Sequence, residues 1–160
     1  MIRFYKHSGI HTLLAEQSFS ATRQYVWSFL SQPHNLSEIT PQHMGFQVTS
    51  PLKPEKMYSG QIITYKVSPF KGFRINWITE ITHVQEGWYF VDEQRFGPYR
   101  FWHHKHFLSE TEKGVKMTDE VSYKMPFGFL GEIINRLLVK RRLRKIFEYR
   151  QAVLPKQFGN

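Results

Sequence analysis

Residues 87–125, GWYFVDEQRFGPYRFWHHKHFLSETEKGVKMTDEVSYKM, contain the pattern that decides the fold. Three segments of this stretch, 87–95, 99–108 and 114–125, are rich in β-branched and aromatic residues and are separated by turn-forming residues. Successive strands with short connections form an antiparallel meander, which buries one face of the sheet. The stretch therefore predicts three consecutive antiparallel strands.

Alternation along these strands predicts which side chains are buried, because successive residues of a strand point to opposite faces. Lys105, in the middle of segment 99–108, indicates that the odd positions of that segment face solvent. Its even positions, including Trp102, His104 and His106, then face the core. In the following strand the predicted core-facing residues are Val115, Met117, Asp119, Val121 and Tyr123.

Polar residues meet on this predicted buried face. A loop at 109–114 would place His104 directly opposite Asp119, and the same alternation puts Asp92 beside Trp102 or His104. A buried carboxylate needs a partner, so Asp119 is predicted to be hydrogen-bonded to one of the two core-facing histidines. The predicted polar cluster consists of Asp92, His104, His106 and Asp119.

Three roles remain open for this cluster. It can be a structural network that fixes the strand register, or a set of groups that orients a ligand. It can also perform acid–base chemistry, in which case His104 and Asp119 would be the catalytic residues. Two histidines and two aspartates can bind a divalent ion, but the H-x-H spacing with distant aspartates is a weak indication. No metal site and no cofactor is therefore predicted.

The rest of the chain extends this sheet. A strand at 10–19 precedes an amphipathic helix that begins near 20–22 and stops at Pro33, and a short second helix follows at 33–41. Further strands are predicted at 45–50, 56–67 and 73–84, and a long helix at 127–154. This order predicts one α+β domain over residues 1–160. Its expected architecture is a curved seven-stranded antiparallel sheet around a long C-terminal helix.

Three strings carry a resemblance to a known group of proteins. FVDEQRFGPYRFWHHKHFL (90–108), MTDEVSYKMPFG (117–128) and IFEYR (146–150) resemble the bacterial single-domain ligand-binding branch of the START-like helix-grip superfamily, also called SRPBCC. This branch is related to polyketide cyclases and coenzyme-Q-binding proteins. The resemblance implies a pocket for a hydrophobic ligand between the sheet and the C-terminal helix. It implies no particular reaction, because the superfamily contains binders, transfer proteins and a few enzymes.

The expected pocket has a volume above ~300 Å³ and an aromatic lining. The 16% aromatic content of the chain, concentrated at core-facing positions, supports this expectation. The predicted ligand-binding residues are Trp77, Phe90, Asp92, Trp102, His104, His106, Met117, Asp119, Val121 and Tyr123.

The C-terminal helix carries two apolar stripes that point in nearly opposite directions. Its first half has a stripe at 130–138 and its second half a stripe at 139–147, so that either the helix bends near Val139 or one half exposes apolar surface. The run KRRLRK (140–145) lies where they cross. It is interpreted as a solvated face, as a contact with an anionic membrane, or as a contact with nucleic acid, for which no specific motif is present. The membrane contact would use Lys140, Arg141, Arg142, Arg144 and Lys145.

Composition narrows the function classes. The 160 residues carry a net charge of +9 and no cysteine, and no apolar run approaches the ~20 residues that span a bilayer, so a cytoplasmic protein is expected. We predict a non-enzymatic binding or carrier protein for a small hydrophobic or aromatic molecule, such as a lipid, quinone or polyketide. The alternatives are a cyclase, dehydratase or isomerase that uses His104 and Asp119, and an interaction module that acts through the basic helix.

Overall fold

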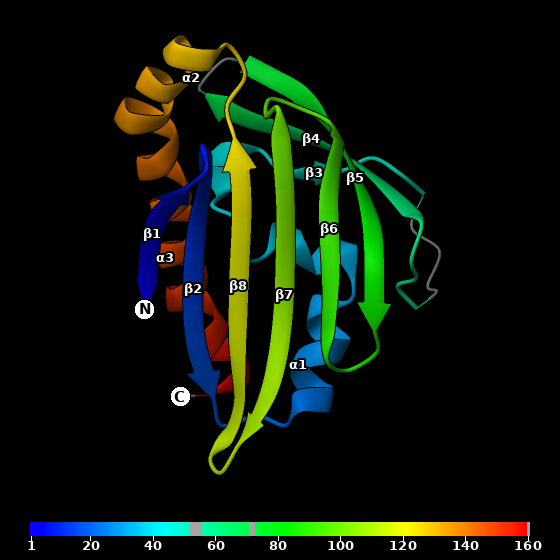
Figure 1. The fold of residues 1–160 in the computed structure, drawn as a ribbon. Helices are drawn as coiled ribbons and strands as arrows, with labels where there is room; N and C mark the ends of the chain where they lie inside the picture. The colour runs from blue at the N-terminus through cyan, green and yellow to red at the C-terminus, as the bar shows by residue number, and fades with distance from the viewer. Residues whose placement is uncertain (52–55, 71–72, 160) are drawn as a thin grey trace.

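The computed structural model describes residues 1–51, 56–70 and 73–159. This part of the chain forms an α+β structure with an eight-stranded antiparallel sheet in the order β1-β2-β8-β7-β6-β5-β4-β3 (Figure 1). The strands are β1 (Ile2–His7), β2 (Ile10–Phe19), β3 (Gln47–Val48), β4 (Gln61–Phe70), β5 (Phe73–Gln85), β6 (Tyr89–Phe96), β7 (Phe101–Thr111) and β8 (Gly114–Lys124). The helices are α1 (Arg23–Leu30), two 3₁₀ segments (Pro33–Ser37 and Gln42–Met44), α2 (Gly128–Ile134), a π-helical segment (Asn135–Val139) and α3 (Lys140–Phe158).

The antiparallel meander is confirmed, since β5, β6, β7 and β8 pair in sequence order and each pair is antiparallel. The predicted count of seven strands is wrong, because the edge strand β1 was not expected. Most of β1 is exposed and its last residues are Lys6 and His7, so it lacks the apolar alternation of a half-buried strand. It pairs with β2 through a tight turn at Ser8 and Gly9, both of which have positive φ.

The register of the β7–β8 hairpin also differs from the prediction. Thr111 pairs with Gly114, so the connection is a two-residue turn instead of a loop at 109–114. The pairing is therefore displaced by two residues, and His104 lies opposite Val121 instead of Asp119. A displacement by two keeps every side chain on its predicted face. The turn residues Glu112 and Lys113 lack the Asn-Gly or Asp-Gly signal that would have indicated so short a connection.

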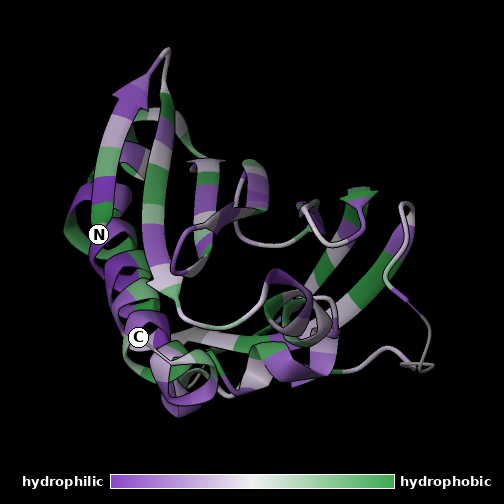
Figure 2. Ribbon diagram, turned by 90° about the horizontal axis from the view of Figure 1, so that it is seen from below, coloured by the Kyte–Doolittle hydropathy of each residue, from purple (hydrophilic) through white to green (hydrophobic). Residues whose placement is uncertain are grey.

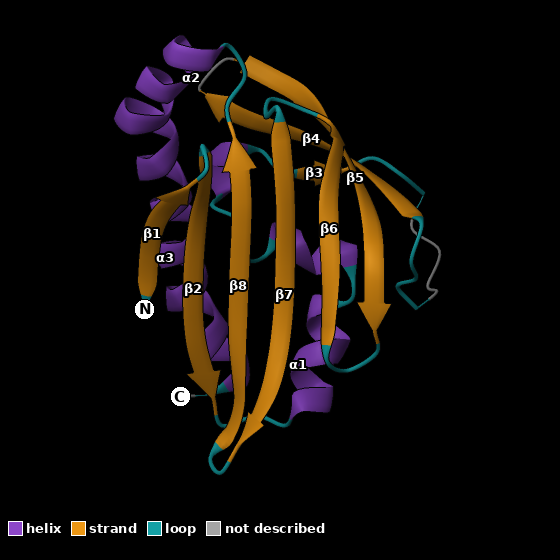
Figure 3. Ribbon diagram, in the orientation of Figure 1, coloured by secondary structure: helices purple, strands orange, loops and turns teal. Residues whose placement is uncertain are grey.

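Sheet curvature and a one-sided helical layer create the interior. The β5–β6 register is irregular at Ile78–Thr79 and again at Ile81–His83, and such bulges bend a strand. β5 bends accordingly in Figure 1, and β4 runs across the top of the view while β7 and β8 run lengthwise. In Figure 3, α1 and α3 lie behind the sheet and α2 lies beside its upper left end, so no labelled helix covers the front face of β2, β8, β7 and β6.

The C-terminal helix divides at the π-helical segment. From its last residue onward, Val139, Leu143 and Phe147 are buried against Leu13 and Ala15 of β2 and against residues of β8. Before this point the apolar stripe, with Leu130, Ile133, Ile134 and Leu137, is exposed. Of the two expected arrangements, the structure therefore has the one in which half of the helix exposes apolar surface. The outer side of α3 is largely hydrophilic (Figure 2). In the described residues no helix combines the length and apolarity that crossing a membrane requires.

Candidate functional site

A cavity of about 170 Å³ lies between the inner face of the sheet, the α1 and 3₁₀ region, and α3. The expected volume above ~300 Å³ is wrong, because aromatic rings project into the space. Trp77 and Trp102 meet edge to face with their ring centres 5.2 Å apart, and Phe90 stacks on His106 at 4.1 Å. Eight of the ten predicted ligand-binding residues line the cavity: Trp77, Phe90, Asp92, Trp102, His104, His106, Met117 and Asp119.

The other two predicted residues, Val121 and Tyr123, do not line it. Their buried orientation was predicted correctly, but the beginning of the C-terminal helix covers this part of the sheet. Both side chains pack with Val139 and Leu143, and the Tyr123 hydroxyl donates a 2.9 Å hydrogen bond to Oδ1 of Asn135. Strand alternation identifies the buried face, but it does not show which part of that face a helix covers.

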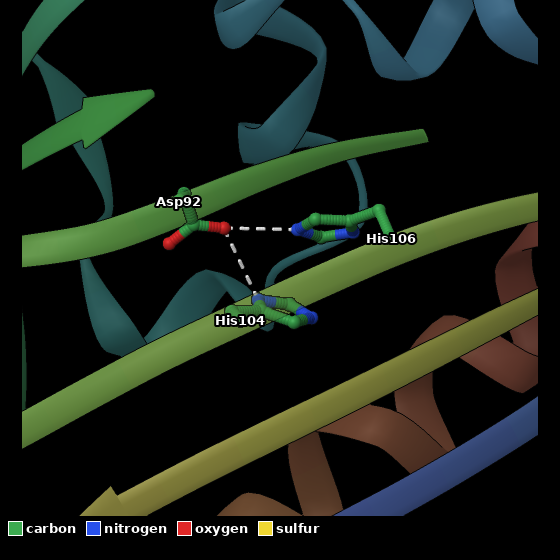
Figure 4. Close-up of side chains that lie close together, drawn as sticks. All are labelled: Asp92, His104 and His106. Carbon is green, nitrogen blue, oxygen red and sulfur yellow. Dashed lines mark hydrogen bonds and ion pairs between the residues drawn. The ribbon is translucent and has the colours of Figure 1, made fainter. Parts of the chain in front are cut away.

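The predicted polar cluster is present as a closed ring of two aspartates and two histidines at the wall of the cavity. Nε2 of His104 lies 3.1 Å from Oδ1 of Asp119, which confirms the predicted hydrogen bond, and Nδ1 of His106 lies 2.8 Å from the same oxygen. On the other side, Oδ2 of Asp92 lies 2.9 Å from Nε2 of His106 and 3.3 Å from Nδ1 of His104 (Figure 4). Each histidine therefore bridges both carboxylates.

The ring favours ionised carboxylates. Burial of Asp119, which is 2% exposed, opposes ionisation, but the hydrogen bonds and charge of His104 and His106 outweigh it and hold the pKa of Asp119 well below its ordinary range. The same balance, with the charge of His104 as the main favourable contribution, lowers the pKa of Asp92. Burial would lower the pKa of His104, but Asp92 and Asp119 outweigh burial and raise it. The two carboxylates thus favour His104 as an imidazolium.

The same atoms form a group with metal-ligating chemistry. The ligand atoms of Asp92, His104 and His106 all lie within 4.8 Å of one another. Two imidazoles and one carboxylate are a donor set for divalent transition metals.

The ring predicts a specific pH dependence of stability in EDTA-containing buffer. The lowered pKa values of Asp92 and Asp119 stabilise the fold above the unfolded-state value near 4, and this stability is lost as the pH falls. The raised pKa of His104 acts oppositely: its contribution is complete below ~6.5 and is lost as the pH rises through its folded value. We expect the free energy of unfolding in urea to fall between pH 5 and pH 3, and to fall less steeply in Asp119→Asn. Equal slopes would contradict the ionised ring.

Arg150 was not predicted as a site residue, although it lies within the string 146–150. Its guanidinium lines the cavity, lies 4.9 Å from the ring centre of Phe147, and makes no hydrogen bond through Nε within the described residues. Burial lowers the pKa of Arg150, and the charges of Asp119 and Asp92 partly offset this effect. Its spacing of three and seven residues from Phe147 and Leu143 places it on the inward face of α3, and this periodicity was the available signal.

No family model matches the sequence, and no curated protein matches it. Solved structures do match over nearly the whole chain. Protein Ms6760 from Mycobacterium smegmatis has a TM-score of 0.68 at 17% identity and covers 98% of each chain. Ara h 8.0201 has a TM-score of 0.61 at 15% identity, with 92% of this chain and 99% of that chain covered. The ginseng major latex-like protein 151 from Panax ginseng has a TM-score of 0.57 at 13% identity, with 86% and 97% covered.

The chain has the helix-grip fold. The similar arrangement across these structures, at such low identity, establishes the fold alone. In this helix grip the Asp–His ring lies on β6, β7 and β8, facing α3 across the cavity.

Proposed function

We propose that this helix-grip protein binds a small, largely hydrophobic or aromatic molecule that carries a polar group. The observation that supports this proposal is the cavity itself, whose lining is mostly aliphatic and aromatic and includes the buried Asp–His ring. Ligand sites typically combine an apolar wall with a few polar groups that fix orientation. The resemblance of 90–108, 117–128 and 146–150 to the ligand-binding branch of the superfamily supports the same conclusion.

The cavity dimensions favour a compact ligand. Its volume of about 170 Å³ is below the ~300–1,000 Å³ typical of pockets for drug-sized molecules. The half-buried guanidinium of Arg150, on α3, and the ring of Asp92, Asp119 and the two histidines, on the sheet, both line this cavity. A ligand with an acidic or hydroxyl group at one end of an aromatic body would match both parts of the lining.

Blocking the cavity tests the proposal. Ile146 lines it from α3, and Ile146→Trp is expected to weaken binding of the fluorescent probe anilinonaphthalene sulfonate by about tenfold or more. Ile133→Trp is the matched control, because Ile133 is exposed and does not line the cavity. A loss of probe binding in the control but not in Ile146→Trp would contradict cavity binding. Native mass spectrometry of the purified protein then identifies the class of any bound compound.

The cluster also supports an enzymatic alternative, a cyclase, dehydratase or isomerase. His104 lines the cavity and contacts both carboxylates, and its raised pKa makes it suitable as a general acid. Once mass spectrometry names a compound class, an enzyme would convert that compound to a product of different mass or mobility. His104→Gln would abolish the conversion, whereas a carrier would return the compound unchanged.

We further propose that this carrier contacts an anionic membrane through its C-terminal helix region. Exposed hydrophobic side chains at 127–137 form one apolar face, and basic residues follow directly in the chain. This combination is the pattern of an interfacial helix. The predicted contact residues Lys140, Arg141, Arg144 and Lys145 are exposed, and Arg142 is half-buried. The apolar face consists of Phe127, Phe129, Leu130, Ile133, Ile134 and Leu137.

Backbone strain at Phe127 supports this use of the apolar face. Phe127 has a φ of 66°, in the left-handed region that bulky side chains avoid, yet its side chain is 77% exposed. Strain at an exposed aromatic residue brings no packing within the molecule, and such strain is concentrated at functional sites. A hydrophobic side chain presented in this way is suited to insertion among lipids.

A further inference from the structure

We propose that Asp92, His104 and His106 bind a divalent transition-metal ion and that Asp119 orients the two histidines. The site does not depend on the identity of the organic ligand. It goes beyond the proposed function, because it gives the cavity an inorganic component with its own binding chemistry.

The positions of the three ligand atoms support this proposal. Oδ2 of Asp92 lies 2.9 Å from Nε2 of His106 and 3.3 Å from Nδ1 of His104 (Figure 4). For metal–ligand bonds of ~2.1 Å, neighbouring ligand atoms are about 3.0 Å apart in an octahedral site and about 3.4 Å apart in a tetrahedral one. Two edges of the triangle thus already have the separation of bound ligands. The third edge, between the two nitrogens, is within 4.8 Å.

Asp119 provides the second observation. Its Oδ1 lies 3.1 Å from Nε2 of His104 and 2.8 Å from Nδ1 of His106, which are the nitrogens that face away from Asp92. The His104 contact is a hydrogen bond and the His106 contact is an ion-pair contact; with protons on these two nitrogens, the lone pairs of the opposite nitrogens lie on the side of Asp92. Histidines that ligate a metal commonly donate their other N–H to a carboxylate in this way. One buried carboxylate would therefore orient both metal-binding imidazoles.

Charge balance is consistent with an ion at this place. Without an ion, Oδ2 of Asp92 faces two ring nitrogens, and both contacts are favourable only if each nitrogen carries a proton. A divalent ion between this oxygen and the two nitrogens would offset the negative charges of Asp119, which is buried, and of Asp92, which is half-buried. Metal binding at such a site releases protons and weakens at low pH.

The donor set and its surroundings define the class of ion. Nitrogen from two imidazoles favours Zn²⁺, Fe²⁺, Co²⁺ or Ni²⁺ over Mg²⁺ and Ca²⁺, which prefer oxygen ligands. Asp92, His104 and His106 all line the cavity, so the remaining coordination positions face the space that the organic ligand would occupy.

The test uses the full chain, freed of metal and titrated with Zn²⁺ or Co²⁺ at pH 7.5. We expect one ion per chain, visible absorption bands of bound Co²⁺, and no comparable binding of Mg²⁺. His106→Gln and Asp92→Asn should abolish this binding, and Asp119→Asn should weaken it by about 10–100-fold. His103→Gln is the matched control, because His103 lies on the same strand but opposes Glu93 on the other face, and it should leave binding unchanged.

Nitrogen-15 spectra of the wild-type histidine rings make the test independent of whether the variants fold. Zn²⁺ should shift Nδ1 of His104 and Nε2 of His106, while their other nitrogens remain protonated. Binding that shifts only other histidines, or absence of stoichiometric Zn²⁺ binding to folded wild-type protein, would overturn the proposal. So would folded His106→Gln that binds Zn²⁺ as tightly as the wild type.

Discussion

Asp119→Asn is expected to lower the free energy of unfolding by about 3–5 kcal/mol, the typical cost of removing one partner from a buried ionic pair. The substitution nearly preserves shape but deletes the charge that compensates His104 and His106. A domain of this length has roughly 5–15 kcal/mol in total, so the melting temperature should fall on the order of 10 °C. Calorimetry in EDTA-containing buffer, with and without any compound that native mass spectrometry finds bound, measures this change.

Glu120→Gln is the control, since Glu120 is the next residue on the same strand and faces the open side of the sheet. It pairs with Lys105 at 2.9 Å, and a partly exposed pair of this kind contributes at most ~1 kcal/mol. If Asp119→Asn instead keeps the wild-type melting temperature and loses ligand affinity, the ring orients ligand more than it stabilises the fold. An unchanged melting temperature together with unchanged ligand binding would contradict both roles.

The second large effect concerns membrane binding. The double variant Phe127→Asn/Phe129→Ser should weaken binding to vesicles of phosphatidylcholine and phosphatidylglycerol by roughly 100-fold. Burying one phenylalanine contributes about 1.5–3 kcal/mol, and both side chains are 77% exposed and available for insertion. Asparagine tolerates the left-handed backbone at position 127, so the fold should be unaffected. Co-sedimentation with vesicles provides the measurement.

Phe96→Ser is the control for this experiment, because Phe96 is 61% exposed at the end of β6, outside the apolar face. It should leave vesicle binding unchanged. Raising the salt concentration should weaken binding, since each basic residue near an anionic surface contributes about 1 kcal/mol and is screened by salt. Equal binding to purely zwitterionic vesicles, or no binding by the wild type, would contradict the membrane contact.

The sequence predicted the sheet and its inward face because alternation is a local property. The alternation of Asp119 with Met117 and Val121 was sufficient to assign the faces of β8. For β7, the position of Lys105 between His104 and His106 showed that the histidines point to the other face. The exact strand pairing depends on the turn at Glu112 and Lys113, where the residue types do not specify the loop length. Each side chain nevertheless lies on its predicted face of the sheet, because the register differs from the prediction by an even number of residues.

The missed features depend on packing between distant elements. Arg150 faces the cavity because α3 lies across it from β6, β7 and β8. Helical periodicity places Arg150 on the same face as Phe147, but it does not show where α3 lies relative to the sheet. Val121 and Tyr123 were assigned to the pocket because alternation did not reveal that Val139 and Leu143 cover them. The cavity volume likewise depends on side-chain orientations, such as the edge-to-face arrangement of Trp77 and Trp102.

The π-helical segment Asn135–Val139 sets the rotational phase between the two halves of the C-terminal helix. A π turn arises in effect from one extra residue in an α-helix, and each residue of an α-helix corresponds to a rotation of about 100°. Deleting one residue here would turn α3 as a unit relative to α2. Either Phe147 and Arg150 would leave the cavity, or the apolar face would turn inward. The number of residues in this segment, more than their side chains, thus determines whether α3 can line the cavity while the apolar face at 127–137 remains exposed.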